Sequence, residues 1–218
     1  MQDEQLQQLT ASEPLSLEEE YEMQRKWRDD EDKLTFIILA REPNEGPSPP
    51  FNDDEASTDA SDPCLESLPM VGDVNLFFSG TLNPEKAISE PSNDITNPDG
   101  RDADGDDEDA FSAEAEIMIA EPAYRRRGFA FEALQLMLQY ASGCPPGVFS
   151  LQPCTETSFT SERSSFPSLP NAIPPDSLLT RISENNMASI SLFENLGFQV
   201  MKHVKVFEEV EMRWRKRS

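Results

Sequence analysis

Apolar residues in this chain recur at strand or helix spacing in several separate blocks. Residues 70–78 alternate between two faces, as a half-buried strand does. The apolar face would carry Val74, Leu76 and Phe78, and the other face Asp73, Asn75 and Phe77. Two further short apolar runs predict strands over Thr35–Ala40 and Ala115–Ala120.

Helical spacing appears in two other blocks. Ser16 is followed three residues later by Glu19, a capping-box pattern that predicts a helix from about Leu17 to Arg28. After Pro122, apolar residues recur at offsets of 0, 3, 4, 7, 8 and 11, which trace one stripe of a helix. That stripe consists of Ala130, Ala133, Leu134, Met137, Leu138 and Ala141.

The C-terminal quarter predicts four more elements. Leu178–Ser183 has the pattern of a strand, and Asn186–Leu196 that of a short helix, with Gly197 where a left-handed cap is wanted. Residues 198–206 and 208–214 predict an antiparallel strand pair. The order is helix, three strands, helix, strand, helix, two strands. We therefore expect an α/β fold in which helices pack on one mixed sheet.

Three stretches interrupt these blocks: residues 41–69, 79–112 and 143–177. They are rich in Pro, Ser, Thr or Asp and show no apolar period, so we predict disordered insertions in a single domain spanning 1–218. The ordered blocks are then about 6–40, 70–78, 113–142 and 178–215. The acidic run Asp102–Asp109 fits no calcium-loop register, and we expect no metal site.

Composition narrows the class of protein. The chain has 218 residues, with 42 acidic against 18 basic, for a net charge of −24, which argues against a nucleic-acid partner. It has no apolar run long enough for a membrane span, and its start has neither the basic nor the apolar part of a secretory signal. Three cysteines without metal-ligand spacing favour a reducing compartment, cytoplasmic or nuclear.

The segment richest in chemistry is the strand that begins at Glu116, its turn, and the striped helix. The turn holds three consecutive bases followed by Gly128, in an otherwise acidic protein. Backbone N–H groups at a helix start lack partners, and the helix dipole is positive there, so this turn predicts a phosphate site. The alternative is a solvated basic turn.

Two motifs here resemble those of the GCN5-related N-acetyltransferases. Arg125-x-x-Gly128-x-Ala130 matches the pyrophosphate loop of that family, and the segment from Asn186 to Phe198 resembles its last helix and the Leu-Gly-Phe turn. The stretches 9–15, 19–21, 35–38 and 70–76 are similar to the N-acetyltransferase 9-like subfamily. Leu9–Leu15 would line the acceptor side.

The resemblance implies an acyl-CoA N-acyltransferase (GNAT-like) fold, acetyl-CoA as cosubstrate, and direct acetyl transfer to a protein or peptide amine. α-Amino groups and tubulin are the acceptors associated with the subfamily. Pantetheine would pair with the strand backbone at Ile117, Met118 and Ile119. The remaining coenzyme contacts it implies are Arg125, Arg126, Arg127, Gly128, Phe129, Ala130, Asn186 and Ser189.

Two residues carry competing interpretations. Glu116 is the candidate general base, because a carboxylate on this strand could face the acceptor amine; the alternative is a polar residue on an exposed strand face. Asn186 could contact the coenzyme or simply cap its helix. Phe193 stands where the family often has the Tyr that protonates the leaving thiolate, which Phe cannot do.

The family also begins with a strand and a helix upstream of the Leu9 segment, whereas eight residues precede Leu9 here. The expectation is a fold without that first pair, in which residues 35–40 form an exposed edge. Two functions other than catalysis therefore stay open: a non-catalytic CoA-binding or interaction protein with a degenerate acetyltransferase fold, and an acidic disordered scaffold.

Overall fold

The computed structural model describes residues 15–41, 63–81, 110–145, 147–150 and 168–216 of the chain. Most of the three predicted insertions and the Leu9–Pro14 stretch lie outside these residues. Within the described part, no helix is both long enough and apolar enough to cross a membrane.

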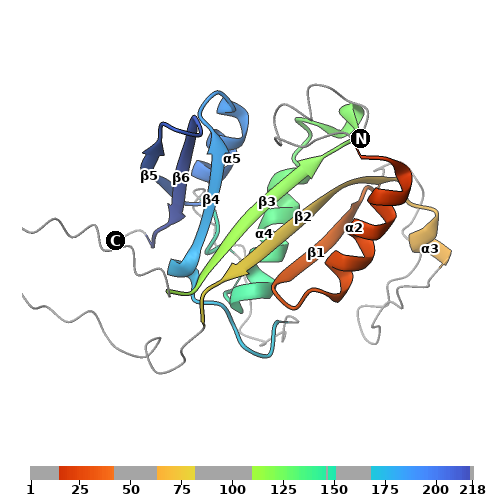
Figure 1. Ribbon diagram of the computed structural model, residues 1–218, viewed down its shortest axis with the longest axis horizontal. Coiled ribbons are helices and arrows are strands. Elements are labelled where there is room, and N and C mark those ends of the chain that lie inside the picture. Colours follow the sequence, from red (N-terminus) through yellow and green to blue (C-terminus); the bar gives the residue numbers. More distant parts are fainter. Residues whose placement is uncertain (1–14, 42–62, 82–109, 146, 151–167, 217–218) are drawn as a thin grey trace, which may run out of the picture.

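One six-stranded sheet organises the described residues, in the order β1-β2-β3-β4-β6-β5 (Figure 1). All neighbouring strands are antiparallel except β3 and β4, which are parallel. The strands are β1 (Lys33–Leu39), β2 (Met70–Ser79), β3 (Ser112–Ile119), β4 (Leu178–Ser183), β5 (Phe198–Val204) and β6 (Glu209–Trp214). The predicted mixed α/β fold is confirmed.

Helices cover both faces of this sheet. In Figure 1, α2 lies in front of β1 and α4 behind the sheet. The helices are α2 (Leu17–Asp29), α3 (Pro63–Glu66), α4 (Phe129–Ser142) and α5 (Met187–Asn195), with single 3₁₀ turns η2 (Pro122–Tyr124) and η3 (Pro175–Ser177).

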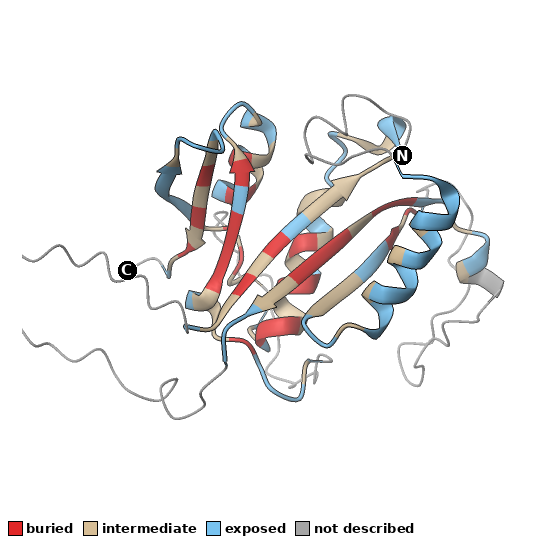
Figure 2. Cartoon of the chain, in the orientation of Figure 1, coloured by how far each residue is buried: buried red, intermediate tan, exposed pale blue. Residues whose placement is uncertain are grey.

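The core lies between the sheet and α4, as the red positions in Figure 2 show. The strand alternation places every second side chain on this face, and the α4 stripe packs against it. Of the six predicted stripe residues, Leu134, Met137, Leu138 and Ala141 are buried, and the two alanines nearest the start of the helix are half-buried.

α2 is held at its start by the predicted capping box. The Glu19 N–H donates to Ser16 Oγ at 3.3 Å, and the Ser16 N–H donates to Glu19 Oε2 at 2.8 Å. No residue of α2 is fully buried. It contacts the sheet through Trp27, whose ring meets Phe77 edge-on at 6.2 Å. The helix therefore lies on the sheet face opposite the main core.

Two predicted insertions are ordered at their ends. Pro63–Glu66, within the first predicted insertion, forms the short α3. In the third, Phe149 is completely buried and Ile173 is in the same core cluster. An isolated apolar residue in a Pro- and Ser-rich stretch has no periodic signal. The sequence pattern therefore predicts a disordered insertion there.

Gly72 of β2 lies against the backbone of β3 with no room for a side chain. A Cβ at this position would overlap the Met118 carbonyl oxygen and reach the Ile119 Cα at 3.0 Å. We expect Gly72→Ala to lower the free energy of unfolding by about 3 kcal/mol, because the overlap is with rigid backbone. Urea denaturation measures this.

Gly143→Ala is the matched control. Gly143 is left-handed at φ 64°, but a Cβ there would make only ordinary contacts, with Ala172 at 3.7 Å and Ser168 at 3.9 Å, so the substitution adds backbone strain of about 1 kcal/mol without overlap. Equal losses for the two variants would contradict a steric role for Gly72.

Candidate functional site

The site begins where β3 and β4 part. These parallel strands pair only at Ala113 with Leu178 and at Glu114 with Leu179. Beyond that point they diverge (Figure 1), and no described strand pairs with the β4-facing edge of Ile117–Ile119. All three of these residues are half-buried. An edge of this kind can accept an extended ligand as an added strand.

The loop after β3 forms the second part of the site. It runs through η2 into two left-handed residues, Arg126 at φ 63° and Gly128 at φ 94°, and α4 begins directly afterwards. Glycine adopts this conformation without steric cost, whereas Arg126 is strained. Successive N–H groups in such a turn form a concave anion site, which the helix dipole reinforces.

Among the described residues, no side chain caps the start of α4, and its first intrahelical bond runs from the Glu132 N–H to the Gly128 carbonyl. A Cβ on Gly128 would meet no described residue within 4 Å. The N–H groups of the first turn, which no side chain of these residues caps, are donors that an anion could use.

Arg125 is turned back into the protein. Its Nε donates to the Ile119 carbonyl at 2.9 Å and its Nη2 to the Ala120 carbonyl at 2.8 Å. The guanidinium therefore ties the loop to the end of β3, a role that the sequence motif did not reveal. Its predicted contact with pyrophosphate stays a prediction.

The other two arginines of the loop are exposed. The Arg127 guanidinium lies over the Tyr124 ring at 5.1 Å and the Phe129 ring at 5.5 Å, contacts typical of cation–π pairs. Both arginines lie in the loop that leads into α4, and their contacts with a phosphate stay a prediction.

The Arg125 anchor can be tested without any ligand. Lysine keeps the charge but has no planar fork to bond two successive carbonyls. We expect Arg125→Lys to speed amide hydrogen exchange in residues 121–128 about ten-fold, as the loop opens more often. Arg126→Lys is the control, and an unchanged rate in Arg125→Lys would refute the anchor.

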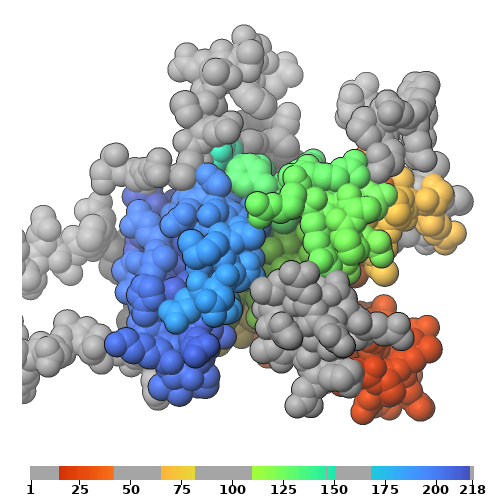
Figure 3. All heavy atoms as spheres, turned by 90° about the horizontal axis from the view of Figure 1, so that it is seen from above, coloured from red at the N-terminus to blue at the C-terminus, as the bar shows by residue number. Residues whose placement is uncertain are grey.

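α5 begins at the same edge of the sheet, because β3 and β4 are parallel and their carboxyl ends point the same way. Asn186 caps this helix: its Oδ1 accepts from the Ser189 N–H at 3.2 Å. The capping interpretation is therefore confirmed. Coenzyme contacts of Asn186 and Ser189 remain predictions. Seen from above, the C-terminal strands and α5 lie beside β3 and its loop (Figure 3).

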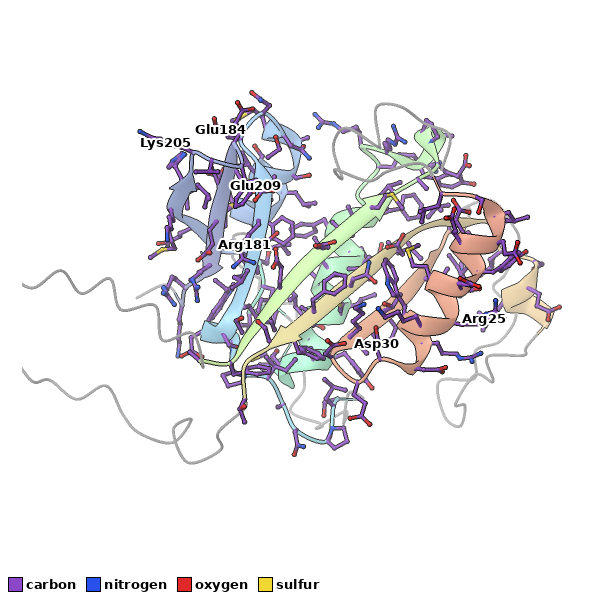
Figure 4. The ribbon with its side chains drawn as sticks, viewed as in Figure 1. Arg25, Asp30, Arg181, Glu184, Lys205 and Glu209 are labelled. Atoms are coloured by element: carbon purple, nitrogen blue, oxygen red, sulfur yellow. The ribbon has the colours of Figure 1, made fainter. Side chains whose placement is uncertain are left out.

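A polar face forms the third part of the site. The register places Glu114 and Glu116 on the sheet face opposite α4, with Arg181 of β4. Arg181 pairs with Glu114 across the strands and with Glu211 of β6 at 3.5 Å. Figure 4 shows Arg181 and Glu209 on these neighbouring strands. The Arg181–Glu114 ion pair joins β3 and β4 where these strands still pair, just before they diverge.

Glu116 carries the chemistry that a proton acceptor needs. Its side chain is exposed on the strand face, yet partial desolvation by the surrounding protein raises its pKa, and the nearby carboxylates of Glu114, Asp73 and Glu209 raise it further. Desolvation likewise raises the pKa of Glu114, although Arg181 opposes the shift. A carboxylate with a raised pKa is a better general base.

Phe193 does not face this site. It is 2% exposed and packs edge-on against Phe198, with ring centroids 5.1 Å apart. It is a core residue and supplies no acid. In the described residues, no group of three His, Cys, Asp or Glu side chains is placed to hold a metal ion.

Sequence reasoning did not show which polar residues of β2 lie beside Glu116. Asn75 is its direct neighbour on β2, and Asp73 lies two residues further along the same face. The alternation had put both residues on the polar face. The strand pairing that brings them to Glu116 has no local sequence signal.

Comparisons with known proteins show which family the chain resembles. A family profile described as an acetyltransferase (GNAT) domain matches residues 96–199. The N-acetyltransferase 9-like protein of Schizosaccharomyces pombe is 33% identical over 214 residues, covering 97% of this chain and 83% of that protein. The alpha/beta-tubulin-N-acetyltransferase 9 of Drosophila melanogaster is 34% identical over 212 residues, covering 97% of this chain and 73% of its own length.

Solved structures match more distantly. Arabidopsis thaliana NAA60 in complex with acetyl-CoA aligns with 97% of this chain and 89% of its own, at 13% identity and a TM-score of 0.44.

Proposed function

The chain belongs to the GNAT acetyltransferases, in their N-acetyltransferase 9-like branch, and from this premise we propose that it moves an acetyl group from acetyl-CoA to an amine of a protein or peptide. The family makes it an acetyltransferase. The donor, the acceptor and the residues that hold them are the proposal.

One observation carries the proposal: the unpaired edge of β3 leads directly to the anion site at the start of α4, residues 126–130, called the anion cradle below. A ligand that fits both must be extended, able to pair with a strand backbone, and end in phosphate. Pantetheine joined to a diphosphate has this chemistry. The residues that would hold it are Ile117, Met118 and Ile119 for the arm, and the N–H groups of Arg126 to Ala130 for the diphosphate.

The polar face supplies the acceptor side. Acetyl-CoA, when bound, supplies an acetyl thioester. The amine nitrogen forms a bond to the acetyl carbon as the carbon–sulfur bond breaks, and Glu116 takes the amine proton. The conjugate thiol has a pKa of about 8.5, so the thiolate can leave without an acid at position 193.

The acceptor is an amine on a protein or peptide. Relatives from Drosophila melanogaster, Mus musculus and Homo sapiens carry the name alpha/beta-tubulin-N-acetyltransferase 9. The acidic face around Glu116 suits a cationic amine. We propose tubulin as the first acceptor to try, and the cytoplasm as the compartment that fits it.

The test uses the purified full chain with labelled acetyl-CoA. The acceptors are α- and β-tubulin N-terminal peptides, the same peptides with a blocked α-amine, and lysine peptides. We expect label only on free amines. Coenzyme binding without transfer to any of them would instead support the non-catalytic CoA-binding alternative.

A further inference from the structure

Three side chains form a hydrogen-bonded line on the polar face of β1 and β2. Thr35 Oγ1 donates to Asn75 Oδ1 at 2.7 Å, and Asn75 Nδ2 donates to Asp73 Oδ1, also at 2.7 Å. Asn75 is only 4% exposed, so its amide cannot turn to water for these bonds. The Asp73 carboxylate is therefore held in one orientation by a buried amide.

This line ends beside Glu116. Thr35, Asn75 and Glu116 are direct partners across β1, β2 and β3. Asp73 is two residues from Asn75 on the same face, so it is the diagonal neighbour of Glu116, at a distance that a side chain can bridge. The two carboxylates interact: the charge of Asp73 contributes to raising the Glu116 pKa.

Three bases of the described strands on this face pair with other acids, among them Arg213 of β6, which bonds Glu211 at 2.8 Å. Lys33 of β1 pairs with Asp30 at 3.0 Å, and Arg181 of β4 pairs with Glu114 and Glu211. The acids that face the pair from neighbouring strands are Glu114 and Glu209. A cation brought by a ligand would therefore meet two adjacent carboxylates.

The arrangement costs stability rather than adding it. Desolvation raises the Asp73 pKa, which means that the folded protein disfavours the charged form, and the Asn75 bond offsets this only in part. A neutral side chain at this position would avoid the desolvation cost. The stability of the fold therefore does not explain why an acid stands at position 73.

We propose that Asp73 binds the ammonium form of the acceptor amine beside Glu116, with Asn75 and Thr35 as the positioning residues that hold its carboxylate in place. The inference rests on the proposed acetyl transfer at the same site. Asp73 acts as the electrostatic anchor of the cationic acceptor. The ammonium first gives one proton to Glu116, and the neutral amine then attacks; its second proton goes to the departing thiolate as the amide forms.

The central experiment is Asp73→Asn in the full chain, with steady-state kinetics on two acceptors that share one peptide sequence. One ends in an α-amine and is mostly cationic near neutral pH. The other ends in an aminooxy group and is neutral. We expect the KM for the amine to rise about ten-fold, with kcat within about three-fold, and the KM for the aminooxy peptide to stay unchanged.

Controls separate this role from effects on folding and on coenzyme binding. Asp176→Asn removes the same charge from the exposed η3 turn and should leave both KM values unchanged. The melting temperature of Asp73→Asn should equal or exceed that of the wild type, because a disfavoured charge is removed. Its affinity for CoA should not change.

The positioning residues are tested by Thr35→Val, which keeps the side-chain shape but removes the hydroxyl donor. We expect a rise of about three-fold in the amine KM, and recovery in Thr35→Ser, which restores the donor.

The outcomes are distinct. An unchanged amine KM in Asp73→Asn overturns the inference, and so does an equal loss for both acceptors or a loss of CoA binding. A wild-type chain that acetylates no amine overturns the proposed function and this inference together.

Discussion

Gly128→Glu is expected to abolish coenzyme binding. The new side chain would begin just before the α4 N–H groups, at a point where a Cβ meets no described residue within 4 Å. Two unit charges about 4 Å apart repel by about 4 kcal/mol at an effective dielectric of about 20, which corresponds to about 1000-fold in affinity. Calorimetric titration with CoA measures the loss.

Gly128→Gln is the matched control. It has the same shape and suffers the same backbone strain at φ 94°, which costs about 1–2 kcal/mol in the folded state, but it carries no charge. The two variants should therefore melt at similar temperatures, and the glutamine form should bind CoA far more tightly than the glutamate form. Equal affinities would mean that the diphosphate lies elsewhere.

Glu116→Gln is expected to lower kcat by about 100-fold, the smaller end of what a general base contributes. CoA affinity should stay the same, because Glu116 lies on the acceptor face and not in the anion cradle. The melting temperature should be equal or higher, since desolvation and three nearby acids disfavour the charged form of Glu116. Retention of full kcat would exclude Glu116 as the base.

The pH profile adds a second readout for Glu116. The base must be ionised to accept a proton, so kcat/KM in the wild type falls as the pH falls through the Glu116 pKa. That pKa is raised above the ordinary glutamate value, so the acid limb should lie above the range of an exposed glutamate. The limb should disappear in Glu116→Gln, and its survival there would assign it to another group.

Local patterns predicted most of the secondary structure. Leu178–Ser183 is the strand that its alternation and apolar content indicated. The Ser16 and Glu19 pair starts α2 as a capping box, and Gly197 is left-handed at φ 96° directly after α5. Each feature depends on residues a few positions apart, and the chemistry of such short stretches is visible in the sequence.

The site was only partly predictable. The motif located the cradle at Gly128, and the structure finds an open helix start there. It did not show that Arg125 turns back to the carbonyls of β3, because the orientation of a side chain depends on the acceptors around it. The motif aligns Phe193 with a Tyr that acts as an acid in the family, whereas its packing against Phe198 places it in the core.

Motifs and periods within single segments are enough to identify the family, most of the elements and the loop at Gly128. The folded sheet adds what no segment shows: β3 and β4 part after Glu114, β6 lies between β4 and β5, and Asp73 is adjacent to Glu116. These features arise from pairing between strands far apart in the chain. That pairing depends on packing and hydrogen bonding across the whole sheet, which no short stretch of residues encodes alone.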